Sequence, residues 1–210
     1  MIFETIIVGP YEVNCYVLAK DKNSQAIIID PGAETGKINK ALVKHKLTPG
    51  IIINTHGHAD HIGANDNFGI CVYIHKQDAL FLNDPNLNLS QFTGFPLRIS
   101  SQYKSVEDKE EISLDGIKLQ VLHTPGHTPG GICLLLKEPG NSIVFSGDTL
   151  FCQGIGRTDF PGSSFEKLKE SIEKKLFALR EQTKVYPGHG PSTTIGQEKH
   201  NNPFLNEHIA

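Results

Sequence analysis

Four side chains of metal-binding types lie within six residues of this chain, directly after a short apolar run. The run at residues 51–54 is Ile-Ile-Ile-Asn, which is typical of a buried strand. The polar cluster that follows it consists of His56, His58, Asp60 and His61. Neutral imidazole is the commonest metal ligand, and carboxylate completes a set suited to zinc, iron or manganese. Because α/β proteins place their chemistry at strand ends, the chain has to fold with this strand end opening into a site.

The same arrangement recurs three times further along the chain. In each case an apolar strand ends, small residues follow, and one ligand-type side chain emerges; these side chains are His127, Asp148 and His189. Glycine beside each of them lets the backbone turn tightly and approach its neighbours closely. The repetition predicts that separate strand ends meet at one metal site. A lone histidine, such as His45 or His75, is more often a hydrogen-bonded core or surface residue.

The remaining pattern predicts an α/β fold. Strands are expected at residues 3–8, 15–19, 26–29, 51–54, 71–74, 117–122, 132–136, 143–145 and 184–186, and helices at 35–46, 76–82 and 163–179. The stretch 84–105 is polar and irregular. Two β-rich halves, each closed by helices, suggest two sheets packed face to face with helices outside. A length of 210 residues without a visible linker predicts a single domain over residues 1–210.

Composition limits the partners. The chain has 20 Lys and Arg against 23 Asp and Glu, and a net charge of -3 gives no electrostatic reason to bind nucleic acid or an anionic membrane. The N-terminus has no basic region followed by a long apolar stretch, so no secretory signal is expected. No apolar run approaches the roughly 20 residues that span a bilayer. The four cysteines are scattered, without the spacing of a disulfide scaffold. These features predict a cytoplasmic protein.

The full series, His-x-His-x-Asp-His followed by a spaced histidine, aspartate and histidine, resembles the metallo-β-lactamase superfamily. The match runs from the turn Asp30-Pro31-Gly32 to His189. It implies a four-layer αββα sandwich with a two-metal site between the sheets. The resemblance assigns one metal to His56, His58 and His127, the second to Asp60, His61 and His189, and makes Asp148 the bridge. The implied cofactors are two divalent metal ions, zinc first, with iron and manganese as alternatives.

Two metal ions at such a site support hydrolysis. Two cations about 3.5–4 Å apart hold a bridging water whose pKa falls toward neutrality, and one cation polarises a substrate carbonyl. Asp60 is implied as a ligand of the second metal that also orients the resulting hydroxide. A structural zinc site is disfavoured, because such sites use four ligands, mostly cysteine. Asp30 has two interpretations, as a brace for the 56–61 loop or as a residue that simply ends its strand.

Within the superfamily the chain most resembles the glyoxalase II-like enzymes. The shared motifs are Thr-His-x-His-x-Asp-His-x-Gly, His-Thr-Pro-Gly-His-Thr-Pro-Gly, Ser-Gly-Asp-Thr-Leu-Phe and Pro-Gly-His-Gly. They imply hydrolysis of a thioester such as S-lactoylglutathione by a metal-bound hydroxide. A thiol, with a pKa of about 8.5, leaves as thiolate without a dedicated general acid. Arg157, in the segment 154–160, is predicted to bind a substrate carboxylate; the alternative is an arginine that ties down a glycine-rich loop.

The chain departs from full-length glyoxalase II in two ways that bear on whether glutathione is the thiol of the substrate. Only residues 190–210 follow His189, too few for the C-terminal helical domain through which full-length glyoxalase II grips glutathione. Asp159 stands where an aromatic substrate contact is expected. The chain therefore looks like the short, single-domain branch of this family, for which specificity for glutathione does not follow.

A second reaction class uses nearly the same residues. Persulfide dioxygenases resemble this chain in fold, ligand series and the Gly-Arg-Thr-Asp-Phe segment, but they bind a single iron through two histidines and an aspartate. Residues 149–151 and Pro161-Gly162 favour the glyoxalase-type branch. A β-lactamase is disfavoured by the missing signal peptide, and a nuclease by the lack of an added nucleic-acid-binding domain. A non-catalytic protein would have degraded ligands, and none is degraded here.

Overall fold

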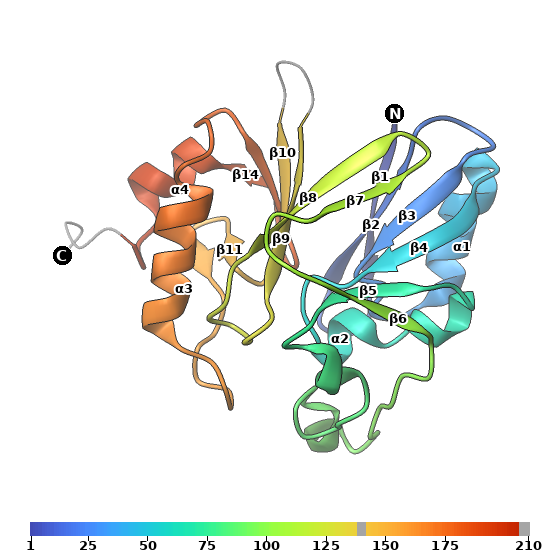
Figure 1. The fold of residues 1–210 in the computed structure, drawn as a ribbon, viewed down its shortest axis with the longest axis horizontal. Coiled ribbons are helices and arrows are strands. Elements are labelled where there is room, and N and C mark those ends of the chain that lie inside the picture. The colour runs from blue at the N-terminus through green and yellow to red at the C-terminus, as the bar shows by residue number, and fades with distance from the viewer. Residues whose placement is uncertain (138–141, 206–210) are drawn as a thin grey trace.

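Two β-sheets face each other, and helices cover their outer surfaces. The computed structural model describes residues 1–137 and 142–205. Figure 1 shows α1 (Thr35–His45) outside one sheet, and α3 (Phe165–Ser171) and α4 (Ile195–Asn201) outside the other. The predicted four-layer αββα sandwich is confirmed.

The first sheet holds six strands in the order in which they occur along the chain. They are β1 (Ile2–Val8), β2 (Val13–Ala19), β3 (Gln25–Ile29), β4 (Thr48–Ile53), β5 (Val72–His75) and β6 (Tyr103–Val106). β1, β2 and β3 pair antiparallel, and β3 to β6 pair parallel. Parallel neighbours need a crossover, which α1 supplies between β3 and β4. The carboxyl ends of β3, β4 and β5 therefore lie at the same edge of the sheet.

The second sheet has the order β14-β13-β10-β9-β8-β7. Its strands are β7 (Glu111–Leu114), β8 (Ile117–His123), β9 (Ile132–Leu136), β10 (Ile143–Gly147), β13 (Lys184–Pro187) and β14 (Thr193–Thr194). β10 and β13 pair parallel, and the other neighbours pair antiparallel, so the ends of β8, β10 and β13 share one edge. A two-stranded sheet, β11 (Leu150–Phe151) with β12 (Gly154–Ile155), follows β10.

Apolar side chains from both sheets make the central core. Leu18 and Ile27 of the first sheet pack in one cluster with Leu119, Leu134 and Phe145 of the second, all fully buried. Alternate side chains of the same strands point outward, and they form separate apolar clusters with α1 and with α3 and α4. Burial on both faces explains why these strands read as almost continuous apolar runs in the sequence.

Short helical segments complete the fold. They are α2 (Ala59–Ile62), the 3₁₀ turns Asn65–Phe68, Ala79–Leu82 and Ser90–Thr93, and a π-helical turn, Ile172–Leu176, that continues α3. Within residues 1–137 and 142–205, no helix has the length and apolar character needed to cross a bilayer.

The structure differs from the predicted elements in several places. The helix expected at 76–82 is wrong: only Ala79–Leu82 forms a turn, because Asp78 is buried and its carboxylate binds other loops. The pattern does not predict β6, three of whose four residues are exposed. It also misses β7 and α4, and the helix after residue 163 ends at Leu176 rather than at 179.

Candidate metal centre

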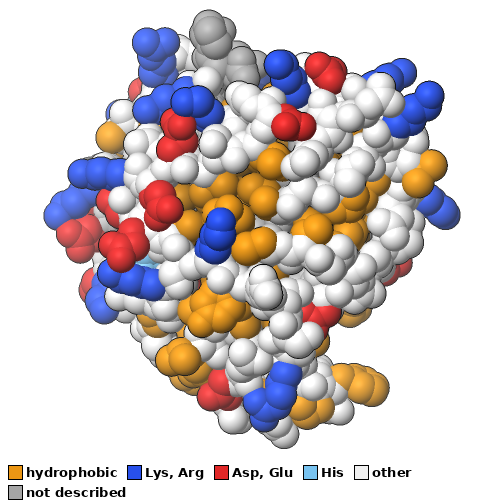
Figure 2. Space-filling view, turned by 45° about the vertical axis from the view of Figure 1, so that its right-hand side comes forward, with side chains coloured by type: hydrophobic (Ala, Val, Ile, Leu, Met, Phe, Trp, Pro, Cys, Tyr) orange, Lys and Arg blue, Asp and Glu red, His pale blue; other side chains and the backbone are white. Residues whose placement is uncertain are grey.

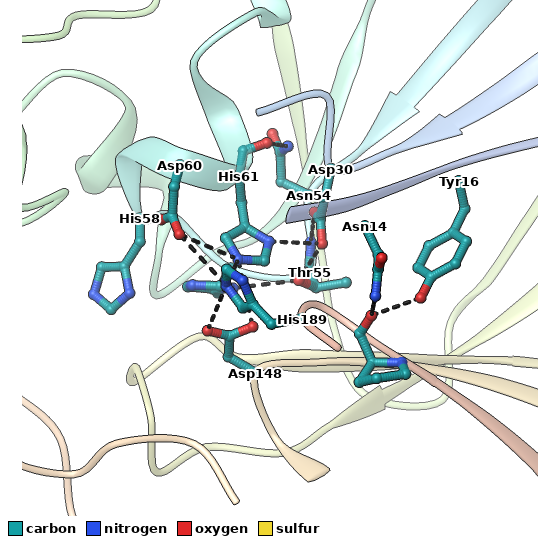
Figure 3. Close-up of polar contacts among 12 residues, drawn as sticks. Asn14, Tyr16, Asp30, Asn54, Thr55, His58, Asp60, His61, Asp148 and His189 are labelled. Atoms are coloured by element: carbon teal, nitrogen blue, oxygen red, sulfur yellow. Dashed lines mark hydrogen bonds and ion pairs between the residues drawn. The ribbon is translucent and has the colours of Figure 1, made fainter. Parts of the chain in front are cut away.

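The seven predicted ligand residues meet where strand ends of both sheets come together. Residues 56–61 follow β4, His127 follows β8, Asp148 follows β10 and His189 follows β13. Figure 3 shows aspartate and histidine side chains of these segments converging from different strands. Sequence positions far apart are thus brought to one place by the shared edges of the two sheets.

Three histidines form one side of the cluster. His58 Nδ1 lies 2.9 Å from His127 Nε2, and the centre of the His56 ring lies 4.8 Å from the centre of each of their rings. All three residues are buried. Their ligand atoms lie within 4.8 Å of one another, close enough to share one ion.

Asp60, His61 and His189 form the other side. His61 Nε2 lies 3.3 Å from His189 Nε2, and Asp60 Oδ2 lies 3.5 Å from His189 Nε2 and 3.8 Å from His61 Nε2. His61 is fully buried, whereas Asp60 and His189 are half-buried. The ligand atoms of this group also lie within 4.8 Å of one another.

Asp148 lies between the two sides. Its Oδ1 is 3.4 Å from His61 Nε2, and its Oδ2 is 3.6 Å from His127 Nε2 and 3.5 Å from His189 Nε2. A carboxylate in this position can ligate ions on both sides. The cluster is therefore suited to a two-metal site.

Two buried polar atoms of the cluster, His56 Nε2 and Asp148 Oδ1, have no hydrogen-bond partner. Buried polar atoms are normally paired, because an unpaired one retains the full cost of losing water. Cations bound on the two sides of the cluster would satisfy both atoms. Imidazole and carboxylate together suit zinc, iron or manganese, so the donor set fits a metal group.

Three of the histidines have their second ring nitrogen held by an oxygen. His61 Nδ1 lies 3.0 Å from the Asp30 carboxylate, His127 Nδ1 lies 2.8 Å from the Arg157 carbonyl, and His189 Nδ1 lies 2.8 Å from the Tyr11 carbonyl. An acceptor at Nδ1 fixes the orientation of each ring, so that Nε2 is the nitrogen directed into the cluster.

Asp30 braces the loop that carries the first four ligands. Its carboxylate accepts hydrogen bonds from the Thr55 backbone N–H at 2.8 Å and from the Thr55 hydroxyl at 2.7 Å, in addition to its contact with His61. Asp30 is buried, and Figure 3 shows it beside Thr55 and His61. Of the two interpretations of Asp30, the geometry supports the brace.

Burial disfavours the charged form of the His56 and His58 imidazoles. Burial lowers the pKa of His58 to about 3, and burial together with the neighbouring His61 lowers the pKa of His56 well below its ordinary value. A neutral imidazole keeps a lone pair free for a metal. This side of the cluster is therefore ready to bind a cation without first losing a proton.

On the other side, the carboxylates favour the protonated form of the histidines. Burial would lower the pKa of His61 and His189, but Asp148 and Asp60 outweigh it, raising the pKa of His61 and bringing that of His189 to about 10. Burial would raise the pKa of Asp60 and Asp148, but these histidines hold both below their usual range. Binding of a cation on this side would therefore release protons.

A pocket of about 750 Å³ lies over the cluster. This volume is in the range of small-molecule sites. Arg157 and Asp159 line it, together with the aromatic side chains Tyr11, Phe92, Phe151 and Phe160. The guanidinium of Arg157 is bound by Asp159, with Nε 2.9 Å from Oδ1 and Nη2 2.7 Å from Oδ2. Arg157 thus lies where a substrate contact is predicted, and its role toward a substrate stays a prediction.

A family model described as the metallo-beta-lactamase superfamily matches residues 8–192 of this chain. The chain belongs to this superfamily. Among its curated relatives, the probable metallo-hydrolase YqgX of Bacillus subtilis is 41% identical over 204 residues, which cover 95% of each chain. The hydroxyacylglutathione hydrolase GloC of Haemophilus influenzae is 38% identical over 213 residues, covering 98% of this chain and 99% of its own. The resemblance to the superfamily and to its glyoxalase II-like members is confirmed.

Solved structures of superfamily members share the fold. The B3 metallo-β-lactamase BLEG-1 is 41% identical, with a TM-score of 0.89 over 98% of this chain and 100% of its own. TTHA1623 in a di-iron-bound form is 34% identical, with a TM-score of 0.83 over 96% and 100%. ETHE1 from Myxococcus xanthus is 28% identical, with a TM-score of 0.74 over 97% and 84%. Shared fold alone does not decide the substrate.

The loop that carries His189 in this superfamily site is tied to the first sheet by contacts that the sequence does not indicate. Asn14 donates from its backbone to the Gly188 carbonyl at 2.7 Å and from its side chain to the Pro187 carbonyl at 3.0 Å. The Tyr16 hydroxyl donates to the same Pro187 carbonyl at 2.6 Å, and Figure 3 shows the two side chains meeting there. Both residues stand within the apolar strand β2, where no local pattern marks them as supports for the loop.

Asp78 links two other loops of the site. It is fully buried, and its carboxylate accepts hydrogen bonds from the Gly57 N–H at 3.0 Å, the Thr128 hydroxyl at 2.7 Å and the Gly130 N–H at 2.6 Å. Burial raises the pKa of Asp78 to about 6, although these donors lower it. Since the sequence predicts a helix over 76–82, in which an aspartate would face solvent, this role is not visible before the fold is known.

Gly188 leaves the space that Asp148 occupies. A Cβ at position 188 would lie 2.2 Å from Asp148 Oδ1 and 2.8 Å from His61 Cε1. We expect Gly188→Ala to displace Asp148 and to weaken metal binding by about 10- to 100-fold, as when a ligand loses its support. Metal content after dialysis, measured by atomic emission, checks this. Gly36→Ala in α1, where a Cβ meets nothing within 4 Å, is the matched control, and unchanged metal content in Gly188→Ala would contradict the expectation.

Proposed function

We propose that this chain hydrolyses thioesters, S-lactoylglutathione or a related S-acyl thiol, with the help of bound metal ions. The observation that carries the proposal is the position of Asp148 between two groups of ligand atoms, in the lining of a pocket of small-molecule size. The name of GloC, hydroxyacylglutathione hydrolase, supports the same reaction class.

The proposed cofactors are two divalent ions, zinc first, with iron or manganese as alternatives, because imidazole and carboxylate accept all three. The di-iron form of TTHA1623 supports iron among the alternatives. The proposed ligands are His56, His58 and His127 for one ion, Asp60, His61 and His189 for the other, and Asp148 for both. Such a pair supplies a water activated toward hydroxide and a Lewis acid for the carbonyl.

The residues of the chain would orient the reactants. Asp60 lines the pocket with its side chain one-quarter exposed, so we propose that its carboxylate accepts a hydrogen bond from the attacking water or hydroxide and turns the oxygen toward the carbonyl carbon. The aromatic side chains of the pocket would exclude bulk water from the bound thioester. Asp30 would hold the His61 ring in the orientation that this requires.

The remaining ionisable side chains of the pocket suit a leaving group that departs without a dedicated proton donor. Besides the proposed ligands these are Tyr11, Arg157 and Asp159, and the last two bind each other. A thiol of pKa about 8.5 leaves as thiolate without a proton donor, whereas an amine leaving group needs one. This favours thioesters over amides as substrates.

We propose a small-molecule substrate, a cytoplasmic location and no nucleic-acid or membrane partner. Figure 2 shows basic and acidic side chains interspersed on the face drawn there, without a continuous basic field. Binding to nucleic acid or to anionic lipid depends on such a field. The net charge of -3 points the same way.

A mononuclear-iron persulfide dioxygenase is the second candidate, favoured by the structural similarity to ETHE1 from Myxococcus xanthus. Two parallel assays of metal-loaded protein separate the two. One follows hydrolysis of S-lactoylglutathione, and the other follows oxygen uptake with glutathione persulfide. We expect hydrolysis without oxygen uptake; oxygen uptake without hydrolysis would overturn the proposal in favour of the dioxygenase.

A further inference from the structure

We propose that Asp159 determines specificity at this pocket by competing with substrate carboxylates for the guanidinium of Arg157. This inference rests on the proposed function, because it assumes that the substrate enters the pocket over the metal centre. It predicts that the favoured substrates are thioesters that place no carboxylate against Arg157.

Asp159 occupies one of the two bidentate edges of the Arg157 guanidinium, the edge formed by Nε and Nη2. Asp159 Oδ1 accepts from Nε of Arg157 at 2.9 Å, and Oδ2 accepts from Nη2 at 2.7 Å. A bidentate contact of this kind is the geometry in which arginine recognises any carboxylate. A substrate carboxylate that binds this edge has to displace Asp159, and one that binds the other edge, Nη1 and Nη2, meets a guanidinium whose charge Asp159 already balances.

Two contacts hold Arg157 at the pocket, one through its backbone carbonyl and one between its guanidinium and the Phe160 ring. Its carbonyl accepts a hydrogen bond from Nδ1 of His127 at 2.8 Å, and its guanidinium lies 4.4 Å from the centre of the Phe160 ring. The Phe160 ring lies 5.4 Å from the His58 ring and 5.9 Å from the His127 ring. The guanidinium is therefore fixed within reach of a molecule bound at the metal centre.

Among the described residues that line the pocket, Arg157 is the only lysine or arginine, so a substrate carboxylate has no second side chain of this kind to bind. Asp159 balances the charge of Arg157, and aromatic side chains make up much of the remaining pocket lining. A substrate carboxylate thus gains little attraction from the neutral Arg157–Asp159 pair, whereas an uncharged substrate has no such attraction to lose.

The pair is open to exchange with a ligand. The Arg157 and Asp159 side chains are 67% and 64% exposed, so water and salt screen their attraction. Exposed pairs are weak enough to open, and removing one competitor should change affinity by only about three- to fivefold. The effect expected here is therefore modest and specific to carboxylates.

Asp159→Asn tests the proposal with two ligands that cannot react. S-hexylglutathione carries free carboxylates, and its diethyl ester does not. Isothermal titration calorimetry on metal-loaded protein gives Kd for each, and the readout is Kd of the diester divided by Kd of the free acid. We expect this ratio to rise about three- to fivefold in Asp159→Asn, and in the same direction in Asp159→Ala.

Two further variants decide what causes the change. Arg157→Ala added to Asp159→Asn must remove the gain, because the carboxylate then has no guanidinium to bind. Glu111→Gln removes one negative charge from an exposed pair with Lys118 that does not line the pocket, and it must leave the ratio at the wild-type value. An unchanged ratio in Asp159→Asn, a gain that survives Arg157→Ala, or an equal gain in Glu111→Gln would each overturn the proposal.

The binding measurement does not depend on turnover. If wild-type protein hydrolyses no thioester but Asp159→Asn shifts the ratio as expected, the proposed reaction fails and the specificity role of Asp159 stands. If wild-type protein hydrolyses S-lactoylglutathione but the ratio is the same in both proteins, the reaction stands and the role of Asp159 is overturned.

Discussion

Asp148→Ala should lose metal from both sides of the cluster and reduce the rate of thioester hydrolysis at least about a thousandfold. Asp148 contacts His61 on one side and His127 on the other, at 3.4 and 3.6 Å, so its removal leaves each group of ligands one donor short. Catalysis by a metal pair depends on both the activated water and the polarised carbonyl. In hydrolases that use an oxyanion hole, the loss of a single donor to the oxyanion already costs about 10²–10³-fold. Metal per chain and kcat/KM for S-lactoylglutathione are the measurements.

His58→Ala should differ from Asp148→Ala in its metal content. Its Nδ1 faces only His127, so the group containing His61 and His189 keeps its ligands and retains about one ion per chain. His200→Ala, at a side chain 62% exposed on α4, is the control that should keep both ions and full activity. Full turnover in His58→Ala with one ion bound, or in Asp148→Ala without metal, would refute the assignment of two catalytic metals.

Asp78→Ala should weaken metal binding about 10- to 100-fold and destabilise the fold by roughly 3 kcal/mol. The carboxylate of Asp78 joins the loop of Gly57 to the loop of Thr128 and Gly130, which together carry the three-histidine side of the cluster. Removing it leaves three buried donors without an acceptor and frees the two loops from each other. Metal affinity by competition with a chelator, and urea unfolding, measure the two effects.

Asp66→Ala is the matched control for Asp78→Ala. Asp66 also accepts several hydrogen bonds, from Ser100 and Ser101, but it is exposed and touches none of the ligand loops. We expect Asp66→Ala to lower stability while metal affinity stays at the wild-type value. Equal loss of metal affinity in both variants would show that Asp78 acts through general stability and not by positioning the loops.

The sequence predicts the layers of the fold better than its edges. Buried strands such as β2 and β3 are recognisable because both faces are apolar, and the helix at 35–46 is recognisable from its apolar spacing. β6 lies at the edge of its sheet and exposes three residues, so its pattern resembles a loop. The segment 76–82 has a helical pattern, but tertiary contacts of Asp78 override it.

The candidate site also contains residues that the sequence predicts and residues that it does not. The residues predicted as ligands could be picked out because each follows a strand with small residues beside it, and the structure brings all seven together. Their assignment to particular ions stays a prediction. The supports Asn14 and Asp78 could not be picked out, because each acts on loops that are distant in sequence. The pairing of Arg157 with Asp159 also appears only once the side chains are placed.

We propose that two bound metals make this chain a thioester hydrolase. Metal-free protein titrated with zinc, iron(II) or manganese, with S-lactoylglutathione hydrolysis measured after each addition, tests it most directly. We expect the rate to rise until about two equivalents are bound, and we expect Asp148→Ala to show no such rise. A rate that is complete at one equivalent, or no hydrolysis with any of the three metals, would contradict it.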